Sequence, residues 1–254
     1  MKKIICITGA GSGFGEACAH LFSSNNYDLI ITGRRIEKLN ALKTVLEEKF
    51  NNKVYLLPFD VRNRSAVEKA FRDLPEEWKK IDLLVNNAGL ALGRDGFEEA
   101  SLDDWDTMID TNLKGLLYVS KAVIPFMIPN KSGHIINIGS TAGKQVYQKG
   151  NVYCATKHAV QAVSEAMRID LLPHKIKVTV IHPGAAETEF SLVRLKQDAN
   201  EAKKVYEGYE PLHAEDVANV VFYTASLPAH VCINELEITC LAQANAFYLF
   251  KDPV

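Results

Sequence analysis

The sequence lacks the patterns that mark common metal and redox sites. Its seven histidines show neither HxH nor HExxH spacing, so we expect no metal site. Its five cysteines are scattered, odd in number and without a CxxC pair, which favours reduced thiols over a disulfide framework. Reduced thiols are typical of a cytoplasmic protein.

The sequence is also short of long apolar runs and of excess charge of either sign. No apolar run approaches the roughly 20 residues that a membrane span needs, and residues 4–7 are too few for the core of a signal peptide. The chain has 29 lysine and arginine residues against 31 aspartate and glutamate residues, a formal net charge of −2. We therefore expect neither a membrane nor a nucleic acid as a partner.

The 254 residues are 47% hydrophobic and 24% charged, as in a globular chain with a large core. Apolar runs of strand length alternate with longer runs of helical periodicity. The expected strands cover residues 2–9, 28–33, 53–59, 81–89, 133–140, 176–184 and 235–240. The expected helices cover residues 14–24, 36–49, 64–74, 103–127, 152–172 and 214–226.

The expected strands are apolar without polar alternation, which is typical of a parallel sheet buried on both faces. Their alternation with helices predicts an α/β fold, with a doubly wound, seven-stranded parallel sheet and helices on both faces. No linker, repeat or low-complexity stretch divides the chain. We therefore expect a single domain over residues 1–254.

A glycine-rich stretch, TGAGSGFG from Thr8 to Gly15, joins the first expected strand to the first helix. Such glycines allow a tight turn in which main-chain N–H groups and the helix N-terminus bind a pyrophosphate. The glycines fit the pattern TGxxxGxG and not the commoner GxGxxG. A glycine turn with a purely structural role is the alternative.

Four further motifs lie at or beyond the ends of later strands. NNAG (86–89) ends the fourth strand, and NIGS ends the fifth at Ser140. HPGAAET overlaps the end of the sixth strand and continues beyond it. The motif YCATK places Tyr153 and Lys157 four residues apart. In this order, and with the glycine turn, the motifs resemble those of the short-chain dehydrogenase/reductase family over nearly the whole chain. Stretches such as VNNAGLALG, GHIINIGSTAG and LPAHVCINELE resemble most closely its NADP-dependent 3-hydroxy acid dehydrogenases.

The resemblance implies a Rossmann fold, NADP as cofactor, and hydride transfer between nicotinamide and small 3-hydroxy acids. Serine, L-allo-threonine and the pair of 3-hydroxypropionate and malonic semialdehyde are the candidate substrates. A broader carbonyl or 3-oxoacyl reductase is the alternative enzyme, and an NADP-binding sensor or scaffold is the alternative without catalysis. The resemblance assigns catalysis to Asn112, Ser140, Tyr153 and Lys157. It assigns cofactor binding to Gly9, Ala10, Gly11, Ser12, Gly13, Phe14, Gly15, Asp60, Val61, Asn87, Tyr153, Lys157, Pro183, Gly184 and Thr188.

The tyrosine and the lysine have complementary chemistry. Tyrosine is a poor base near neutral pH, with a free pKa of about 10. Lys157 lies one helical turn from Tyr153 on the same face, and its charge favours the phenolate. Tyr153 can then take the alcohol proton during oxidation or return it during reduction, while Ser140 hydrogen-bonds the same oxygen. By the resemblance, Asn112 helps to hold a water that links the lysine to solvent.

The second expected strand ends in ITGRR, residues 31–35, without an acidic residue. An NAD-preferring relative carries an acid there for the ribose hydroxyls, and Gly33 takes that place. Arg34 and Arg35 can bind the 2′-phosphate of NADP by charge-assisted hydrogen bonds, with two solvated charges as the alternative. Because cations are unfavourable at a helix N-terminus, we favour a role in cofactor choice.

Residues Ala185 to Pro211 follow the sixth strand and, by the resemblance, cover the substrate. The segment is rich in charge and poor in bulky apolar residues, which favours a small polar substrate. We expect substrate contacts from Ser140, Tyr153 and Arg194. Arg194 either holds a substrate carboxylate by paired hydrogen bonds or lies solvated on a helix. We expect His182 at an exposed strand end.

Self-association is a further expectation. By the resemblance, the long helices at 103–127 and 152–172 pack against a second copy and give a homotetramer or a dimer. The apolar stretch AFYLF, residues 246–250, packs either on its own domain or on another subunit.

Overall fold

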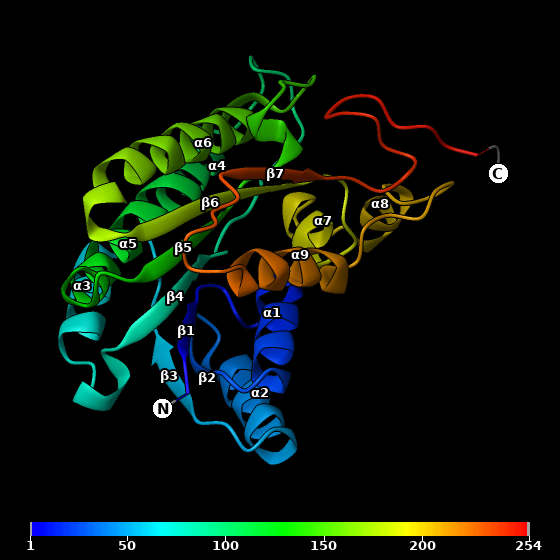
Figure 1. Cartoon of the computed structure of the whole chain (residues 1–254). Coiled ribbons are helices and arrows are strands. Elements are labelled where there is room, and N and C mark those ends of the chain that lie inside the picture. Colours follow the sequence, from blue (N-terminus) through cyan, green and yellow to red (C-terminus); the bar gives the residue numbers. More distant parts are fainter. Residues whose placement is uncertain (1, 253–254) are drawn as a thin grey trace.

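A computed structural model describes residues 2–252 of the protein, in which seven parallel strands form one sheet. The strand order is β3-β2-β1-β4-β5-β6-β7, which confirms the expected Rossmann-type fold (Figure 1). The strands are β1 (Ile4–Ile7), β2 (Asp28–Gly33), β3 (Val54–Pro58), β4 (Ile81–Asn86), β5 (Gly133–Ile138), β6 (Ile176–Pro183) and β7 (Glu235–Ile238). Because β1 pairs with both β2 and β4, the chain turns toward opposite edges of the sheet from this central strand.

Helices cover both faces of the sheet (Figure 1). On one face lie α1 (Gly13–Ser24), α2 (Ile36–Lys49) and α9 (Ala214–Ser226). On the other face lie α3 (Arg64–Arg72), α4 (Leu102–Ile109), α5 (Leu116–Met127) and α6 (Asn151–Leu171). Two short helices, α7 (Glu189–Arg194) and α8 (Ala199–Lys204), lie beyond the carboxyl ends of the strands. No helix within residues 2–252 combines the length and apolarity that a bilayer span requires.

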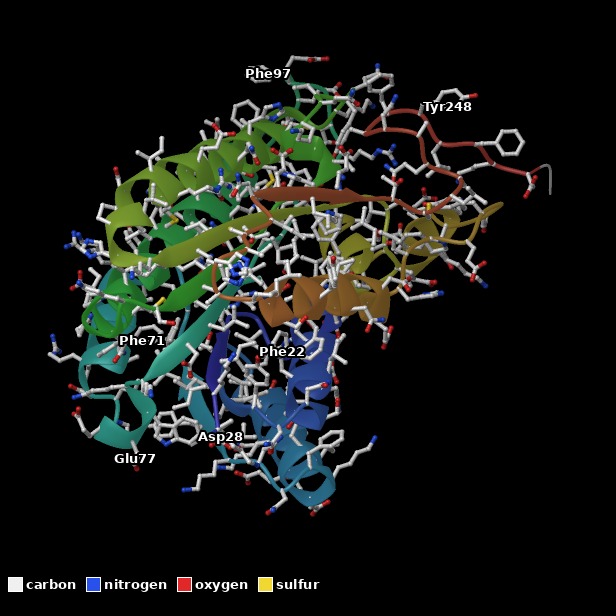
Figure 2. The ribbon with its side chains drawn as sticks, viewed as in Figure 1. Phe22, Asp28, Phe71, Glu77, Phe97 and Tyr248 are labelled. Carbon is white, nitrogen blue, oxygen red and sulfur yellow. The ribbon has the colours of Figure 1, made fainter. Side chains whose placement is uncertain are left out.

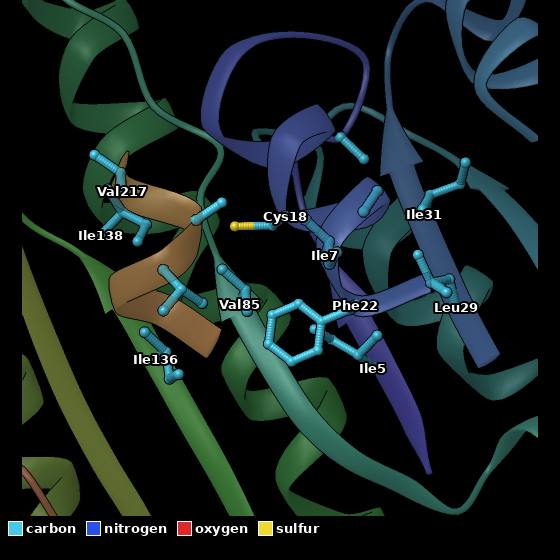
Figure 3. Packing of buried hydrophobic residues seen from close by; sticks show 14 of the residues in the cluster. Ile5, Ile7, Cys18, Phe22, Leu29, Ile31, Val85, Ile136, Ile138 and Val217 are labelled. Carbon is cyan, nitrogen blue, oxygen red and sulfur yellow. The ribbon is translucent and has the colours of Figure 1, made fainter. Parts of the chain in front are cut away.

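The two faces of the sheet bury separate apolar cores. Along β1, Ile5 and Ile7 face the core under α1 and α9, where Phe22 is fully buried (Figure 3). Ile4 and Cys6 face the opposite core, which also contains Phe71 of α3 (Figure 2). Full burial of one such side chain stabilises the fold by about 1.5–3 kcal/mol. The strands are apolar on both faces because each face packs against a buried core. The two cores together fix the position of the sheet's carboxyl edge.

The helix expected over residues 103–127 is interrupted in the structure. Its first part, α4, is capped by Ser101, whose Oγ accepts the Asp104 N–H at 3.4 Å. Residues Asp110–Gly115 then form a π-helical turn between α4 and α5, so the expectation of one continuous helix was wrong. Turns of this kind occur often at functional sites, and this one contains Asn112. The sequence did not give bounds for the six-residue helices α7 and α8, because they are too short to show a helical period.

Candidate active site

A cleft of about 1560 Å³ opens at the carboxyl ends of the strands. Its lining includes residues from the ends of six neighbouring strands or just beyond them: Gly9, Gly33, Phe59, Asn87, Gly139 and Pro183. Ligands of open α/β sheets bind at this edge. The cleft is larger than the roughly 300–1,000 Å³ of a typical pocket for one small ligand. It has room for a dinucleotide and a small substrate together.

The glycine turn after β1 is held by side chains from the neighbouring strand ends. Thr8 Oγ1 accepts the N–H groups of Asn87 and Ala88, each at 3.0 Å. Asn87 Nδ2 in turn donates to the carbonyls of Thr8 at 2.9 Å and Gly9 at 3.2 Å. Gly9 and Gly13 have φ values of 66° and 55°, which other residues rarely adopt. The turn therefore needs glycine at both positions.

The N-terminus of α1 is arranged as an anion site. Its N-cap residue, Ser12, makes no side-chain hydrogen bond to the helix. The first N–H groups of α1 therefore have no side-chain cap, and the helix dipole favours a negative charge there. A Cβ on Gly15 would lie 2.6 Å from Asn87 Nδ2 and would clash with the Gly9 carbonyl. The turn therefore fits a pyrophosphate group. Gly15 packs closely against the main chain of the turn on the side away from the cleft lining.

The end of β2 brings two arginines to the rim of the cleft. A Cβ on Gly33 would lie 3.5 Å from Leu39, which is an ordinary contact. Lack of space therefore does not explain why an acidic residue is absent from this position. The guanidinium of Arg35 donates to Ser12 Oγ at 2.9 Å and pairs with Glu189 at 3.0 Å. In the described part of the chain, Arg34 makes no ion pair. The two arginines are therefore not equivalent.

Asp60 and Val61 line the cleft just beyond β3. Burial opposes ionisation of Asp60, but hydrogen bonds from Arg62 and the nearby positive charges lower the pKa of its carboxyl. The Arg62 side chain donates to both carboxylate oxygens at 2.6–3.0 Å. A Cβ on Gly115 of the π-turn would lie 2.7 Å from Val61. Arg62 therefore fixes the orientation of the Asp60 carboxylate.

Ser140, Tyr153 and Lys157 come together at the inner end of the cleft. Ser140 follows β5, and its Oγ accepts the Ala142 N–H at 3.1 Å. Tyr153 and Lys157 lie one turn apart on α6, with Lys157 Nζ 6.0 Å from the centre of the Tyr153 ring. Lys157 Nζ donates to the Ile138 carbonyl at 2.9 Å, which fixes the ammonium below the site.

Burial controls the acid–base properties of this group. It raises the pKa of Tyr153, and the neighbouring Ser140 side chain and the charge of Arg194 offset only part of the effect. Burial also lowers the pKa of Lys157 to about 8. Because burial outweighs a charge 6.0 Å from the ring, Lys157 by itself does not bring the pKa of Tyr153 below its ordinary value.

Asn112 lies in the π-helical turn, behind the lining of the cleft. Its Oδ1 accepts the Leu90 N–H and its Nδ2 donates to the Leu90 carbonyl, both at 2.8 Å. A Cβ on Gly89 would lie 3.3 Å from Asn112 Oδ1 and 3.6 Å from Lys157 Nζ. Asn112 and Lys157 therefore flank the same glycine.

Arg194, at the end of α7, is half-buried and lines the cleft. Its guanidinium stacks over the rings of Tyr147 and Tyr153, 5.6 and 5.7 Å from their centres. Its Nη1 donates to the Tyr147 hydroxyl at 3.0 Å, and its Nε donates to the Gly93 carbonyl at 3.3 Å. Phe190 of the same helix packs 5.7 Å from the Tyr153 ring. Helix α7 thus brings a positive charge next to Tyr153.

The expectation that His182 lies at an exposed strand end was wrong. His182 is fully buried, with Nδ1 2.8 Å from the Ser140 carbonyl oxygen and Nε2 2.9 Å from Gln161 Oε1. A Cβ on Gly139 would lie 2.6 Å from Nδ1, so glycine makes room for the ring. Burial lowers the pKa of His182. The histidine supports the main chain of Ser140 from below.

Three of the expected site residues do not line the cleft, namely Ala10, Gly15 and Asn112. Ala10 is fully buried, and its N–H donates to the Thr32 carbonyl at 3.0 Å. The remaining expected residues line the cleft, including Pro183, Gly184 and Thr188 beyond β6.

Sequence reasoning missed several lining residues, among them Tyr147, Glu189 and Gln243. Gln243 Oε1 accepts the Ala185 N–H at 2.7 Å and so fixes the chain after β6. All three lie in loops or in the short helix α7, where no period or motif marks them. Within residues 2–252, no group of histidine, cysteine and acidic side chains is arranged to hold a metal ion.

Comparison with known proteins agrees with this geometry. Residues 3–199 match the short chain dehydrogenase family. The chain is 49% identical over 244 residues to the NADP-dependent 3-hydroxy acid dehydrogenase of Salmonella typhi, covering 96% of this chain and 97% of that protein. It is 41% identical over 253 residues to serine 3-dehydrogenase of Agrobacterium fabrum, covering 99% and 100%. The solved closed form of a serine dehydrogenase complexed with NADP+ superimposes with a TM-score of 0.91 at 47% identity, covering 96% and 97%. The chain therefore belongs to the short-chain dehydrogenase family.

Proposed function

We propose that the protein is an NADP(H)-dependent dehydrogenase of small 3-hydroxy acids such as serine, L-allo-threonine and 3-hydroxypropionate. The observation that carries the proposal is one cleft with Ser140, Tyr153 and Lys157 at its inner end and two arginines at its rim. Similarity to 3-hydroxy acid and serine dehydrogenases over nearly the whole chain supports the substrate class.

The cofactor is proposed to lie along the carboxyl edge of the sheet. The glycine turn and the N-terminus of α1 bind its pyrophosphate. Asp60 and Val61 border the adenine, and Arg34 and Arg35 bind the 2′-phosphate by charge-assisted hydrogen bonds. The nicotinamide is bordered by Pro183, Gly184 and Thr188, which line the cleft next to Ser140 and Tyr153.

Proton transfer is assigned to Tyr153. Bound NADP supplies a nicotinamide ring that accepts the hydride and adds positive charge beside the tyrosine. During oxidation Tyr153 Oη takes the proton of the substrate hydroxyl, and during reduction it returns a proton to the carbonyl oxygen. Ser140 Oγ hydrogen-bonds the same oxygen, and the Lys157 ammonium favours the phenolate. Because burial raises the pKa of Tyr153, deprotonation depends on these charges together.

Arg194 is proposed to bind the substrate carboxylate. Its guanidinium lies over the Tyr153 ring, so a carboxylate that it holds comes next to the reacting hydroxyl. Arg194→Ala should raise the KM for a hydroxy acid far more than the KM for a neutral alcohol of the same size. Tyr147→Phe is the matched control, because it removes one hydrogen bond of Arg194 but keeps its charge. Equal effects of Arg194→Ala on both substrates would remove Arg194 from the proposed site.

A profile of substrates and cofactors tests the proposed activity. Serine, L-allo-threonine and 3-hydroxypropionate are assayed with NADP and with NAD, beside simple ketones and 3-oxoacyl thioesters. We expect the highest kcat/KM with NADP and a small hydroxy acid. Higher values with ketones or thioesters favour the broader reductase, and no turnover with any of these compounds favours a binding protein without catalysis.

Three further features are proposed for the whole protein. We propose one domain over residues 1–254, since every strand described joins a single sheet. A cytoplasmic location is supported by the five free cysteines. A homotetramer, or a dimer, is supported by exposed apolar side chains. They are Leu117 on α5, Ile169 on α6, Leu172 just after α6, and Phe247 and Phe250 near the C-terminus. Light scattering of the purified protein measures the number of subunits.

A further inference from the structure

One carboxylate from the covering segment neutralises cations at the rim of the cofactor cleft. Glu189 Oε2 lies 3.0 Å from Arg35 Nη1, and Glu189 Oε1 lies 2.5 Å from Lys38 Nζ. The hydrogen bond from Lys38 is the main reason why the pKa of Glu189 is lowered, so the side chain is ionised at neutral pH. Glu189 is 154 residues away from Arg35 in the sequence, so only the fold brings the two together.

The same contact closes the covering segment over the glycine turn. Thr188 packs on the turn, since a Cβ on Gly13 would lie 3.4 Å from its Cβ. The next residue, Glu189, begins α7 and reaches the cations, and Phe190 then packs against the Tyr153 ring. The start of α7 therefore spans from the cofactor rim to the reacting tyrosine.

We infer that Glu189 competes with the 2′-phosphate of NADP for Arg35 and thereby limits the preference of the enzyme for NADP over NAD. The inference rests on the proposed role of the arginine pair in binding that phosphate. Arg35 is held by Glu189 and Ser12, whereas Arg34 has no ion-pair partner in the part of the chain that the structure describes. Binding of NADP exchanges one anion at Arg35 for another, whereas binding of NAD brings no such anion. The carboxylate therefore weakens the binding of NADP and leaves that of NAD nearly unchanged.

The size of the change in NADP affinity follows from the exposure of the Arg35–Glu189 ion pair. The Arg35 and Glu189 side chains are 46% and 40% exposed, so water and salt screen their attraction. Ion pairs of this exposure are weak, and their removal changes a binding constant by about two- to fivefold. Charge is the cause, so the effect should shrink as ionic strength rises.

The test measures the Kd of NADP and of NAD for the whole enzyme carrying Glu189→Gln. Glutamine keeps the shape of the side chain and removes its charge. We expect NADP to bind about two- to fivefold tighter at low salt, with NAD affinity unchanged. Glu187→Gln is the matched control, because Glu187 is exposed on the same segment and has no ion pair among the described residues. This control should change neither constant.

Each outcome has one meaning. Unchanged or weaker NADP binding in Glu189→Gln overturns the inference, because the carboxylate then does not compete with the phosphate. An equal gain for NADP and NAD also overturns it, since the effect would not involve the 2′-phosphate. The proposed function is tested separately by replacing Arg34 and Arg35 together, which should abolish the preference for NADP. If that variant loses the preference while Glu189→Gln has no effect, only the inference about Glu189 fails.

Discussion

An acidic residue at position 33 should reverse the cofactor preference of this enzyme. Gly33 ends β2 beside Arg34 and Arg35, and its missing side chain leaves space next to Leu39. A Cβ there makes an ordinary contact of 3.5 Å, and the backbone at Gly33 has no positive φ. Gly33→Asp should therefore fold normally while adding a carboxylate where the 2′-phosphate is proposed to bind.

The magnitude follows from Coulomb's law. Two unit charges about 4 Å apart near a protein surface interact by about 4 kcal/mol. The neighbouring arginines and solvent screen the new carboxylate, so we expect a net loss of about 2 kcal/mol, or about thirtyfold weaker NADP binding. NAD should bind more tightly, because an acid at this place accepts hydrogen bonds from the ribose hydroxyls.

The assay compares the kcat/KM for NADP and for NAD in the wild type, Gly33→Asp and Gly33→Asn. Asparagine adds nearly the same volume without the charge, so it separates repulsion from crowding. An unchanged ratio in Gly33→Asp, or an equal shift in both variants, would refute electrostatic selection at this end of β2.

Three further predictions concern the glycine turn, the buried histidine and the buried lysine. Gly15→Ala should abolish NADP binding and lower the free energy of unfolding by about 1–3 kcal/mol, because the alanine methyl group clashes with the Gly9 carbonyl. Cofactor titration measures the first effect, and urea unfolding measures the second. His182→Ala should lower kcat by about ten- to a hundredfold without changing the KM for NADP, because His182 supports Ser140 but does not line the cleft; a change in KM alone would contradict it. Burial lowers the pKa of Lys157 from 10.5 to about 8, so between these pH values the unfolded chain binds more protons than the folded chain. Over this window the contribution of Lys157 to the free energy of unfolding should rise with pH, by up to about 3 kcal/mol. Urea unfolding of the wild type and Lys157→Met on both sides of pH 8 measures this difference, and parallel curves would contradict it.

The sheet could be predicted from the sequence because its strands are apolar on both faces. Ile4 and Ile5 bury their side chains in opposite cores, as is typical of a parallel sheet that is covered on both faces. The glycine turn could be predicted for a similar reason, since the positive φ values of Gly9 and Gly13 restrict those positions. Local sequence determines both features.

The remaining features depend on contacts that local sequence does not contain. The π-turn forms where Asn112 bonds the main chain of Leu90, a contact between distant segments. The burial of His182 depends on Gln161 of α6, which covers the end of β6. From the sequence, Arg194 cannot be told from an ordinary surface charge. In the fold, its guanidinium lies over the ring of Tyr147, which is distant in the sequence.

Tyr153 should transfer the proton while NADP is reduced by a small 3-hydroxy acid. The most direct test is the rate of NADPH formation with serine, L-allo-threonine or 3-hydroxypropionate, in the wild type and in Tyr153→Phe. Phenylalanine keeps the ring that packs against Phe190 and removes only the hydroxyl. We expect turnover by the wild type and loss of nearly all turnover in the variant, with the same Kd for NADP. A variant that keeps near-wild-type turnover while binding NADP normally would contradict proton transfer by Tyr153.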